Sequence, residues 1–97
     1  MPRYVTLLNW TEQGAASFKE TVDRYEGASQ QFEKLGVKLV DVYWTIGDYD
    51  IVTIVEAPDD ESASAALLML GSGGNVRTKA MRAFSPDEMR GVIEKAS

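Results

Sequence analysis

The chain has 97 residues and a formal net charge of −5, from 15 acidic and 10 basic side chains, so it has the size of one domain and a charge balance that disfavours nucleic acid. It contains no cysteine and no histidine, which excludes disulfides, zinc–thiolate sites, iron–sulfur clusters, histidine-ligated haem and Ser-His-Asp or Cys-His catalysis. No apolar run approaches the roughly 18 residues of a membrane span and the first residues lack a signal-peptide pattern, so we expect a cytoplasmic protein without a membrane partner.

The first third of the chain predicts a strand and then a helix. Residues 4–9 form the strand, and Thr11 is placed to cap the helix that follows. Four apolar side chains at helical spacing form a single stripe that should face the core. They are Phe18, Val22, Tyr25 and Phe32. Gly36 is placed to end this helix as a C-terminal glycine.

Two glycines weaken this first helix. Gly14 and Gly27 each cost about 1 kcal/mol relative to alanine, so the sequence allows a kink or break near Gly27. Glu20 and Arg24 are four residues apart, and we expect them to form an ion pair on the outer side of the helix.

The middle of the chain predicts a hairpin and a second helix. Residues 37–45 and 49–56 are strand-like, and a turn at 46–48 joins them. Asp59 is placed to cap the second helix, and Gly71 to end it. The apolar stripe of that helix is Ala63, Ala66, Leu67 and Leu70.

The last quarter predicts a strand over residues 75–83 and a C-terminal helix. Ser85, Pro86 and Glu88 form a complete helix start, with a cap, a proline at the first position and a glutamate three residues after the cap. The apolar side of this helix is Met89, Val92 and Ile93. The order β-α-β-β-α-β plus a helix predicts one ferredoxin-like α+β domain over residues 1–97, with two helices on one face of an antiparallel sheet.

The second and third strands are apolar on both faces, whereas a half-solvated antiparallel strand should alternate. In the second strand, simple alternation places Val37, Leu39 and Tyr43 on one face and Val40, Val42, Trp44 and Ile46 on the other. In the third, it places Ile51 and Val55 against Val52 and Ile54. Two helices cover one face only, so we expect a second copy of the sheet to cover the other. The alternative is that the C-terminal helix folds over that face.

The hairpin carries the segment Gly47-Asp48-Tyr49-Asp50, whose Gly-x-Tyr-Asp core resembles the signature of the GYD-domain family. Residues 11–14, 56–61 and 74–78 are also similar to that family and occur in the same order. The resemblance implies a ferredoxin-like domain that pairs sheet to sheet, as in dimeric α+β barrels, and it implies no settled activity. One departure is that residues 19–26 lack the proline that family members often carry there.

A ligand site is predicted at one edge of the sheet. With the strands in the order four-one-three-two, the ends of the first two strands and the starts of the last two meet there. The polar and aromatic side chains at this edge suit a small-molecule pocket. The candidate ligand-binding residues are Trp44, Thr45, Tyr49, Asp50, Asn75 and Arg77.

Each candidate has an expected role. Arg77 is the natural anchor for a carboxylate or enolate oxygen, Asp50 would orient Arg77 or act as a base, and Tyr49 and Trp44 would form an apolar wall. The alternative is structural, because Asp, Asn and Gly shape turns and an Asp–Arg pair can simply join two strands.

Other polar motifs favour structural interpretations. Asp48 with Asp50, and the acidic residues 59–61, could ligate a hard cation, but a turn and a helix cap explain them better, so no metal or cofactor is predicted. Residues 71–74 follow a helix and enter a strand, so they form a turn and not a phosphate loop. Three cations on the last strand alternate between faces and form no single patch: Arg77, Lys79 and Arg82.

These features lead to three functional hypotheses. The first is a non-enzymatic homo-oligomeric module that binds a small organic ligand or acts as a regulatory subunit. The second is a cofactor-independent isomerase or oxygenase, like other dimeric α+β barrel proteins, whose catalytic residues the sequence does not identify. The third is a purely structural assembly protein. An open cavity with a carboxylate of strongly raised pKa would favour the enzyme, and a fully packed interior the structural protein.

Overall fold

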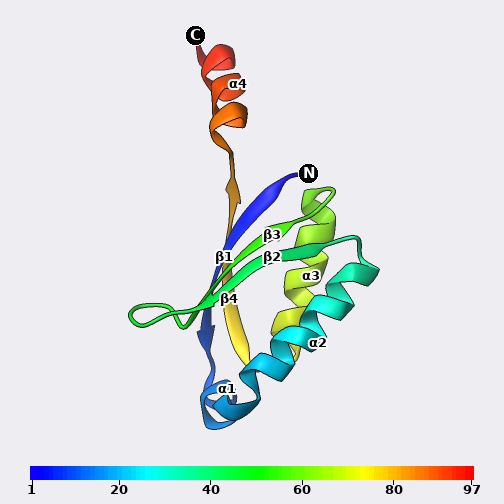
Figure 1. The fold of residues 1–97 in the computed structure, drawn as a ribbon, viewed down its shortest axis with the longest axis vertical. Coiled ribbons are helices and arrows are strands. Elements are labelled where there is room, and N and C mark those ends of the chain that lie inside the picture. Colours follow the sequence, from blue (N-terminus) through cyan, green and yellow to red (C-terminus); the bar gives the residue numbers. More distant parts are fainter.

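The computed structural model describes residues 1–97 as one antiparallel sheet with helices on one face (Figure 1). The elements are β1 Arg3–Trp10, α1 Glu12–Ala16, the 3-10 helix η1 Phe18–Glu20, α2 Thr21–Lys34, β2 Lys38–Trp44, β3 Ile51–Glu56, α3 Asp60–Ser72, β4 Val76–Ala83 and α4 Pro86–Ala96. The strand order β2-β3-β1-β4 is the one that the sequence predicts. α2 and α3 lie on the same side of the sheet (Figure 1). The ferredoxin-like α+β fold is therefore confirmed, and none of its helices is long and apolar enough to cross a membrane.

The buried core lies at one end of the sheet, where β1 begins and β3 ends. It consists of Tyr4, Phe32, Val37, Val55, Ala57, Ala63 and Ala66. The Tyr4 hydroxyl donates a hydrogen bond to the Asp60 carboxylate, and this bond raises the pKa of Tyr4 above its ordinary value. The short side chains of α3 let that helix lie close to the sheet at this end.

The first helix breaks at Ser17 and not near Gly27, where the sequence allows a kink or break. Ser17 donates both its backbone N–H and its hydroxyl to the Gln13 carbonyl, at 3.2 and 2.8 Å, which closes α1 after five residues. α2 then runs through Gly27 without interruption. The changed direction of the chain leaves Phe18 and Val22 exposed, so only the later part of the predicted apolar stripe faces the sheet. The Thr11 cap is confirmed, since its side chain accepts from the Gly14 N–H.

A β-bulge in β2 changes which of its side chains share a face. The pairing of β2 with β3 slips between Leu39 and Asp41. Past a bulge, the alternation of side chains shifts by one residue. Leu39 therefore lies on the helix side together with Val42 and Trp44, and Tyr43 lies on the opposite side. The faces predicted for this strand by simple alternation are wrong beyond the bulge.

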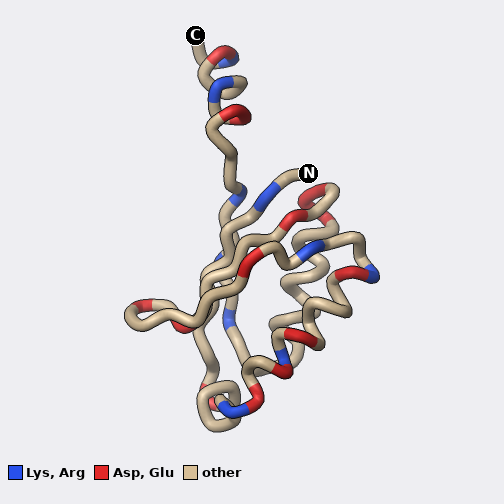
Figure 2. Tube along the Cα trace, viewed as in Figure 1, with Lys and Arg blue, Asp and Glu red and all other residues tan.

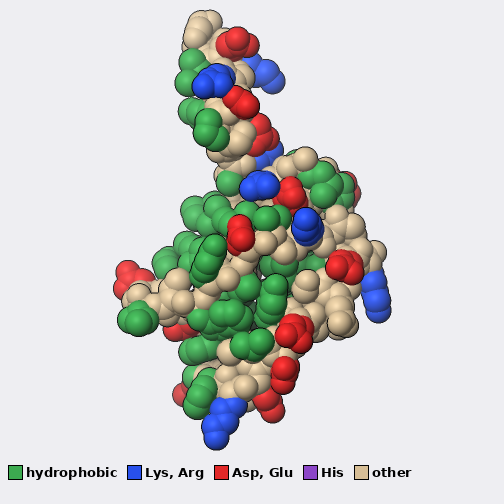
Figure 3. Space-filling model, viewed as in Figure 1, with side chains coloured by type: hydrophobic (Ala, Val, Ile, Leu, Met, Phe, Trp, Pro, Cys, Tyr) green, Lys and Arg blue, Asp and Glu red, His purple; other side chains and the backbone are tan.

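The sheet face opposite the helices, here called the open face, is largely apolar. Its apolar side chains are Val5, Leu7, Tyr43, Val52, Ile54 and Met81. In space-filling view, hydrophobic side chains gather over the strands, while α2 presents mainly polar and charged atoms (Figure 3). An ion pair between Arg3 and Glu56, with a 3.6 Å separation, lies at the rim of the open face.

α4 does not cover the open face. It extends from the end of β4 away from the sheet (Figure 1), and all of its residues are exposed. The alternative in which the C-terminal helix folds over the second face is therefore wrong.

Positive charges form no continuous patch (Figure 2). Arg77 and Lys79 pair with open-face residues of β1, whereas Arg82 stacks on the other side of the sheet, 5.7 Å from the centre of the Tyr4 ring. The predicted division of the cations of β4 between two faces is confirmed.

The predicted helix starts are also present. The Asp59 carboxylate accepts from the Ser62 N–H, and that bond lowers the pKa of Asp59. At the start of α4, the Ser85 and Glu88 side chains each accept from the backbone N–H of the other residue, at 3.1 and 2.9 Å. The hydrogen bond from the Ser85 N–H lowers the pKa of the Glu88 carboxyl below its ordinary value. The stability that this hydrogen bond gives α4 is therefore fully present above the pKa of Glu88 in the unfolded chain. It is lost as the pH falls through the lower pKa of the folded state.

Replacing Ser85 with alanine should destabilise α4 by about 1 kcal/mol, because the Glu88 N–H loses its cap. Amide hydrogen exchange across residues 89–94 should accelerate by about fivefold. Ser29→Ala in α2 is the control and should leave exchange in α4 unchanged. Wild-type amides at 89–94 that already exchange as fast as in an unstructured peptide would contradict the expectation.

Candidate functional site

The six candidate residues lie at one edge of the sheet, but on different faces. The register pairs Asn9 with Arg77 and Trp44 with Ile51, so the ends of β1 and β2 meet the starts of β3 and β4 as expected. Trp44 and Asn75 line a cavity on the helix side. Tyr49 and Arg77 border a hollow on the open face. Thr45 and Asp50 belong to the hairpin loop between β2 and β3.

Asp50 and Thr45 hold the hairpin together. The Asp50 carboxylate accepts from the Trp10 N–H at 2.9 Å, and the Asp50 N–H donates to the Leu8 carbonyl at 2.9 Å. The Thr45 N–H donates to the Asp50 carbonyl at 2.8 Å, and the Thr45 hydroxyl to the Tyr49 carbonyl at 2.5 Å. Asp50 thus joins the loop to β1 through a backbone N–H, and Arg77 has no part in that bond.

The hollow on the open face brings Tyr49 and Arg77 together, as the sequence predicts. Its other lining residues are Leu7, Asn9, Thr78 and Lys79, and Asp50 is not among them. Lys79 lies 5.8 Å from the centre of the Tyr49 ring, in cation–π range. Arg77, the anchor predicted from the sequence, therefore shares this edge with a second cation, Lys79.

The helix-side cavity has a volume of about 90 Å³ and lies between the sheet, α2 and α3. Of its 17 lining residues, 13 are hydrophobic. The strands contribute Leu8, Trp10, Leu39, Val42, Trp44, Ile51, Thr53, Val55 and Val76, and the helices contribute Thr21, Arg24, Tyr25, Ala28, Phe32, Leu67 and Leu70. Asn75, just before β4, completes the lining. None of these residues is a carboxylate.

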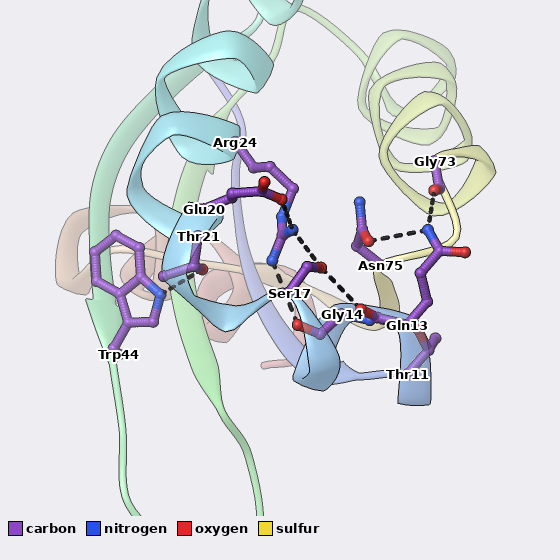
Figure 4. Close-up of polar contacts among 10 residues, drawn as sticks. All are labelled: Thr11, Gln13, Gly14, Ser17, Glu20, Thr21, Arg24, Trp44, Gly73 and Asn75. Carbon is purple, nitrogen blue, oxygen red and sulfur yellow. Dashed lines mark hydrogen bonds and ion pairs between the residues drawn. The ribbon is translucent and has the colours of Figure 1, made fainter.

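Trp44 joins the end of β2 to the first turns of α2. Its indole nitrogen donates to the Thr21 hydroxyl at 2.9 Å, as Figure 4 shows. Its ring meets that of Tyr25 edge to face, with the centroids 6.0 Å apart and the planes at 83°. These two rings form the aromatic wall of the cavity.

Arg24 supplies the one charge on the cavity lining. Its guanidinium donates to the Ser17 hydroxyl at 2.8 Å and to the Gly14 carbonyl at 3.5 Å (Figure 4). The predicted pair with Glu20 exists at 3.6 Å, but the Arg24 side chain is only 26% exposed, against 69% for Glu20. Arg24 therefore faces inward from α2, and its placement on the outer side is wrong.

α1 packs directly onto the start of β4. The Thr11 N–H donates to the Asn75 carbonyl at 3.0 Å, and the Thr11 hydroxyl donates to the Gly74 carbonyl at 2.6 Å. The Gln13 amide nitrogen donates to the Asn75 side-chain oxygen at 3.0 Å (Figure 4). Gly14 lies so close to the Asn75 backbone that a Cβ atom on residue 14 would be 2.0 Å from the Asn75 carbonyl oxygen. These contacts fix Asn75 at the edge of the cavity.

Only Trp44 and Asn75 of the 17 lining residues are among the candidates predicted from the sequence, and the polar groups outside that set include the Arg24 guanidinium and the Trp10 indole nitrogen. That nitrogen is buried and has no hydrogen-bond partner. A usable signal was present for Arg24, because Arg24, Ala28 and Phe32 recur at intervals of four residues on one helix side. Trp10 ends the first strand and so lies at the predicted edge, but the burial of its indole nitrogen depends on the tertiary packing.

The GYD domain family model matches residues 4–93 of the chain. The glutamine synthetase and cystathionine beta-lyase binding protein of Thermus thermophilus is 34% identical over 85 residues, which make up 87% of this chain and 90% of that protein.

Two solved structures share the fold. The structure of TTHA0845 from Thermus thermophilus matches 88% of this chain and 95% of its own, with a TM-score of 0.57 and 22% identity. The leucine response regulatory protein LrpA of Mycobacterium tuberculosis matches 87% of this chain, with a TM-score of 0.66 and 13% identity. This chain spans about half of that regulator, 51% of its length.

Proposed function

The chain belongs to the GYD domain family, and on that premise we propose that it is a non-catalytic, homo-oligomeric binding module of the cytoplasm. Two copies join through their open faces, and the helix-side cavity takes a small organic molecule. The open face is the observation that carries this proposal, because it is apolar and neither the helices nor α4 covers it.

A second copy is the occupant that best suits the open face. Both central strands contribute apolar side chains to it, and charged residues lie toward its margins, including the Arg3–Glu56 pair. A sheet packed against its own copy satisfies both faces with the same residues. A standard interface buries about 800 Å² per partner, and we expect the dimer to bury surface on this scale.

The module also has a regulatory role in our proposal, as a subunit that binds other proteins. The name of the Thermus relative, which describes it as binding two enzymes, supports this role. The enzyme hypothesis is weaker, because the cavity lining offers no carboxylate, lysine or histidine as a base. The purely structural hypothesis is weaker because the interior is not fully packed.

Sedimentation equilibrium of the purified chain tests the assembly. At micromolar concentration the mass should be twice the 10.7 kDa of one chain, or a multiple of that dimer. A single species of 10.7 kDa at that concentration would overturn the proposal.

A further inference from the structure

The helix-side cavity combines an apolar body with one cation at its edge, and we propose that it binds a small apolar monocarboxylate. The carboxylate pairs with the Arg24 guanidinium, and the hydrocarbon part lies among Trp10, Tyr25 and Trp44. This inference rests on the small-molecule part of the proposed function and is independent of the dimer.

The volume and lining determine the hydrocarbon part of the ligand. A water-sized sphere needs roughly 10–15 Å³ on this measure, so a cavity of about 90 Å³ has room for several atoms beyond a single water. Aliphatic and aromatic side chains surround that space on the sheet side and on both helices. A branched aliphatic chain or one aromatic ring suits it, and a sugar or a nucleotide does not.

Arg24 determines the charge of the ligand. An arginine has five N–H donors, and in this chain the guanidinium donates to two acceptors, Ser17 and Gly14. Its third contact, Glu20, is 3.6 Å away on a mostly exposed side chain, and such surface pairs contribute little. A ligand carboxylate bound to the remaining donors would form shorter, charge-assisted hydrogen bonds in a less hydrated place.

The neutral polar groups of the lining also favour an acceptor. The Trp10 indole N–H is buried without a partner, and a buried donor of this kind is costly to leave unpaired. Asn75 uses its side-chain oxygen to accept from Gln13, so its amide nitrogen is the group that it can offer to a ligand. The lining thus offers the donors of Arg24, Trp10 and Asn75, and it contains no acidic group that would repel a carboxylate.

The test is a titration followed by ¹H–¹⁵N spectra, in which the chain's two tryptophans give separate indole signals. The probes are benzoate and 4-methylpentanoate, with benzamide and 4-methylpentanamide as neutral analogues and acetate as the anion without an apolar body. Both carboxylates should shift the Trp10 and Trp44 indole signals. The amides and acetate should bind at least about tenfold more weakly.

Two variants locate the site. Arg24→Gln should weaken benzoate binding at least about tenfold, whereas Arg90→Gln on exposed α4 should leave it unchanged. Ala28→Leu fills the cavity while keeping the charge of Arg24, and it should also weaken binding. This variant tests the site if Arg24→Gln fails to fold.

The inference is overturned if amides bind as tightly as carboxylates, or if the signals that shift belong to Tyr49, Arg77 and Lys79 in the open-face hollow. It is also overturned if no probe binds the folded wild-type chain at about 10 mM, roughly the weakest useful affinity for such small molecules. The mass of the same sample separates the two proposals. A monomer that binds benzoate refutes the dimer alone, and a dimer that binds only the neutral probes refutes the carboxylate alone.

Discussion

Ile54→Lys should convert the dimer into a monomer. Ile54 lies in the interior of β3, opposite Val5 of β1, and its side chain is on the open face. In a sheet-to-sheet dimer the new lysine would be buried without a counter-ion, at a cost of about 3 kcal/mol or more. The dimer dissociation constant should therefore rise by at least about a hundredfold, which sedimentation equilibrium at micromolar concentration would measure.

Leu68→Lys is the matched control for this change. Leu68 is on α3, away from the open face, and is 74% exposed, so the same substitution there should leave the dimer intact. Circular dichroism should show that both variants keep the native fold. A folded Ile54→Lys protein that remains dimeric would mean that the copies join through another surface.

Gly14→Ala and Gly27→Ala should change stability in opposite directions. At Gly14 the added Cβ would meet the Asn75 carbonyl oxygen at 2.0 Å, whereas at Gly27 it meets nothing within 4 Å. Gly14→Ala must push α1 away from β4, and overpacking of this kind costs about 1–3 kcal/mol or more. Gly27→Ala, in the middle of α2, should gain about 1 kcal/mol.

Urea unfolding of the two variants measures this difference directly, since a shift of midpoint at constant slope reports a change in the free energy of unfolding. The two alanines add the same methyl group, so each is the control for the other. A Gly14→Ala protein as stable as the wild type would contradict the close packing of α1 on β4.

Much of the fold follows from signals that are local in sequence. Thr11, Asp59 and Ser85 are caps because their side chains reach an N–H two or three residues ahead, and that geometry needs no tertiary context. Gly36 ends its helix at a positive φ of 73°, which glycine adopts without strain. The strand order followed because few arrangements of such elements are compatible with short connections.

The parts that were not predicted depend on specific contacts that residue propensities do not reveal. The bulge after Leu39 is a property of the pairing of β2 with β3, and no residue type within β2 predicts it. The hydrogen bonds of Ser17 with Gln13 and Arg24 place the helix break, and the sequence offered two glycines that weaken a helix elsewhere. Local propensity was overruled by packing at both places.

The candidate site was predicted at the correct edge of the sheet, but its residues were wrongly grouped into one pocket. Counting along strands placed Tyr49 and Asp50 as neighbours of Arg77, but both precede β3 and belong to the loop. Their directions follow from the loop's own hydrogen bonds, in which Asp50 reaches the Trp10 N–H. Arg24 belongs to the first helix, which no argument based on the sheet edge could include.

Because α4 is isolated, we expect two parts of this small protein, α4 and the rest of the domain, to unfold independently of each other. The only ion pair or side-chain hydrogen bond between α4 and the rest of the chain beyond its cap is that of Glu88 with Arg82, at 3.7 Å. An unsupported helix of 11 residues has little stability of its own in water, so we expect α4, although capped, to unfold at a lower free-energy cost than the sheet. A partner that packs on Met89, Val92 and Ile93 would therefore meet a segment whose order it completes on binding, and its affinity would include the free energy of that ordering.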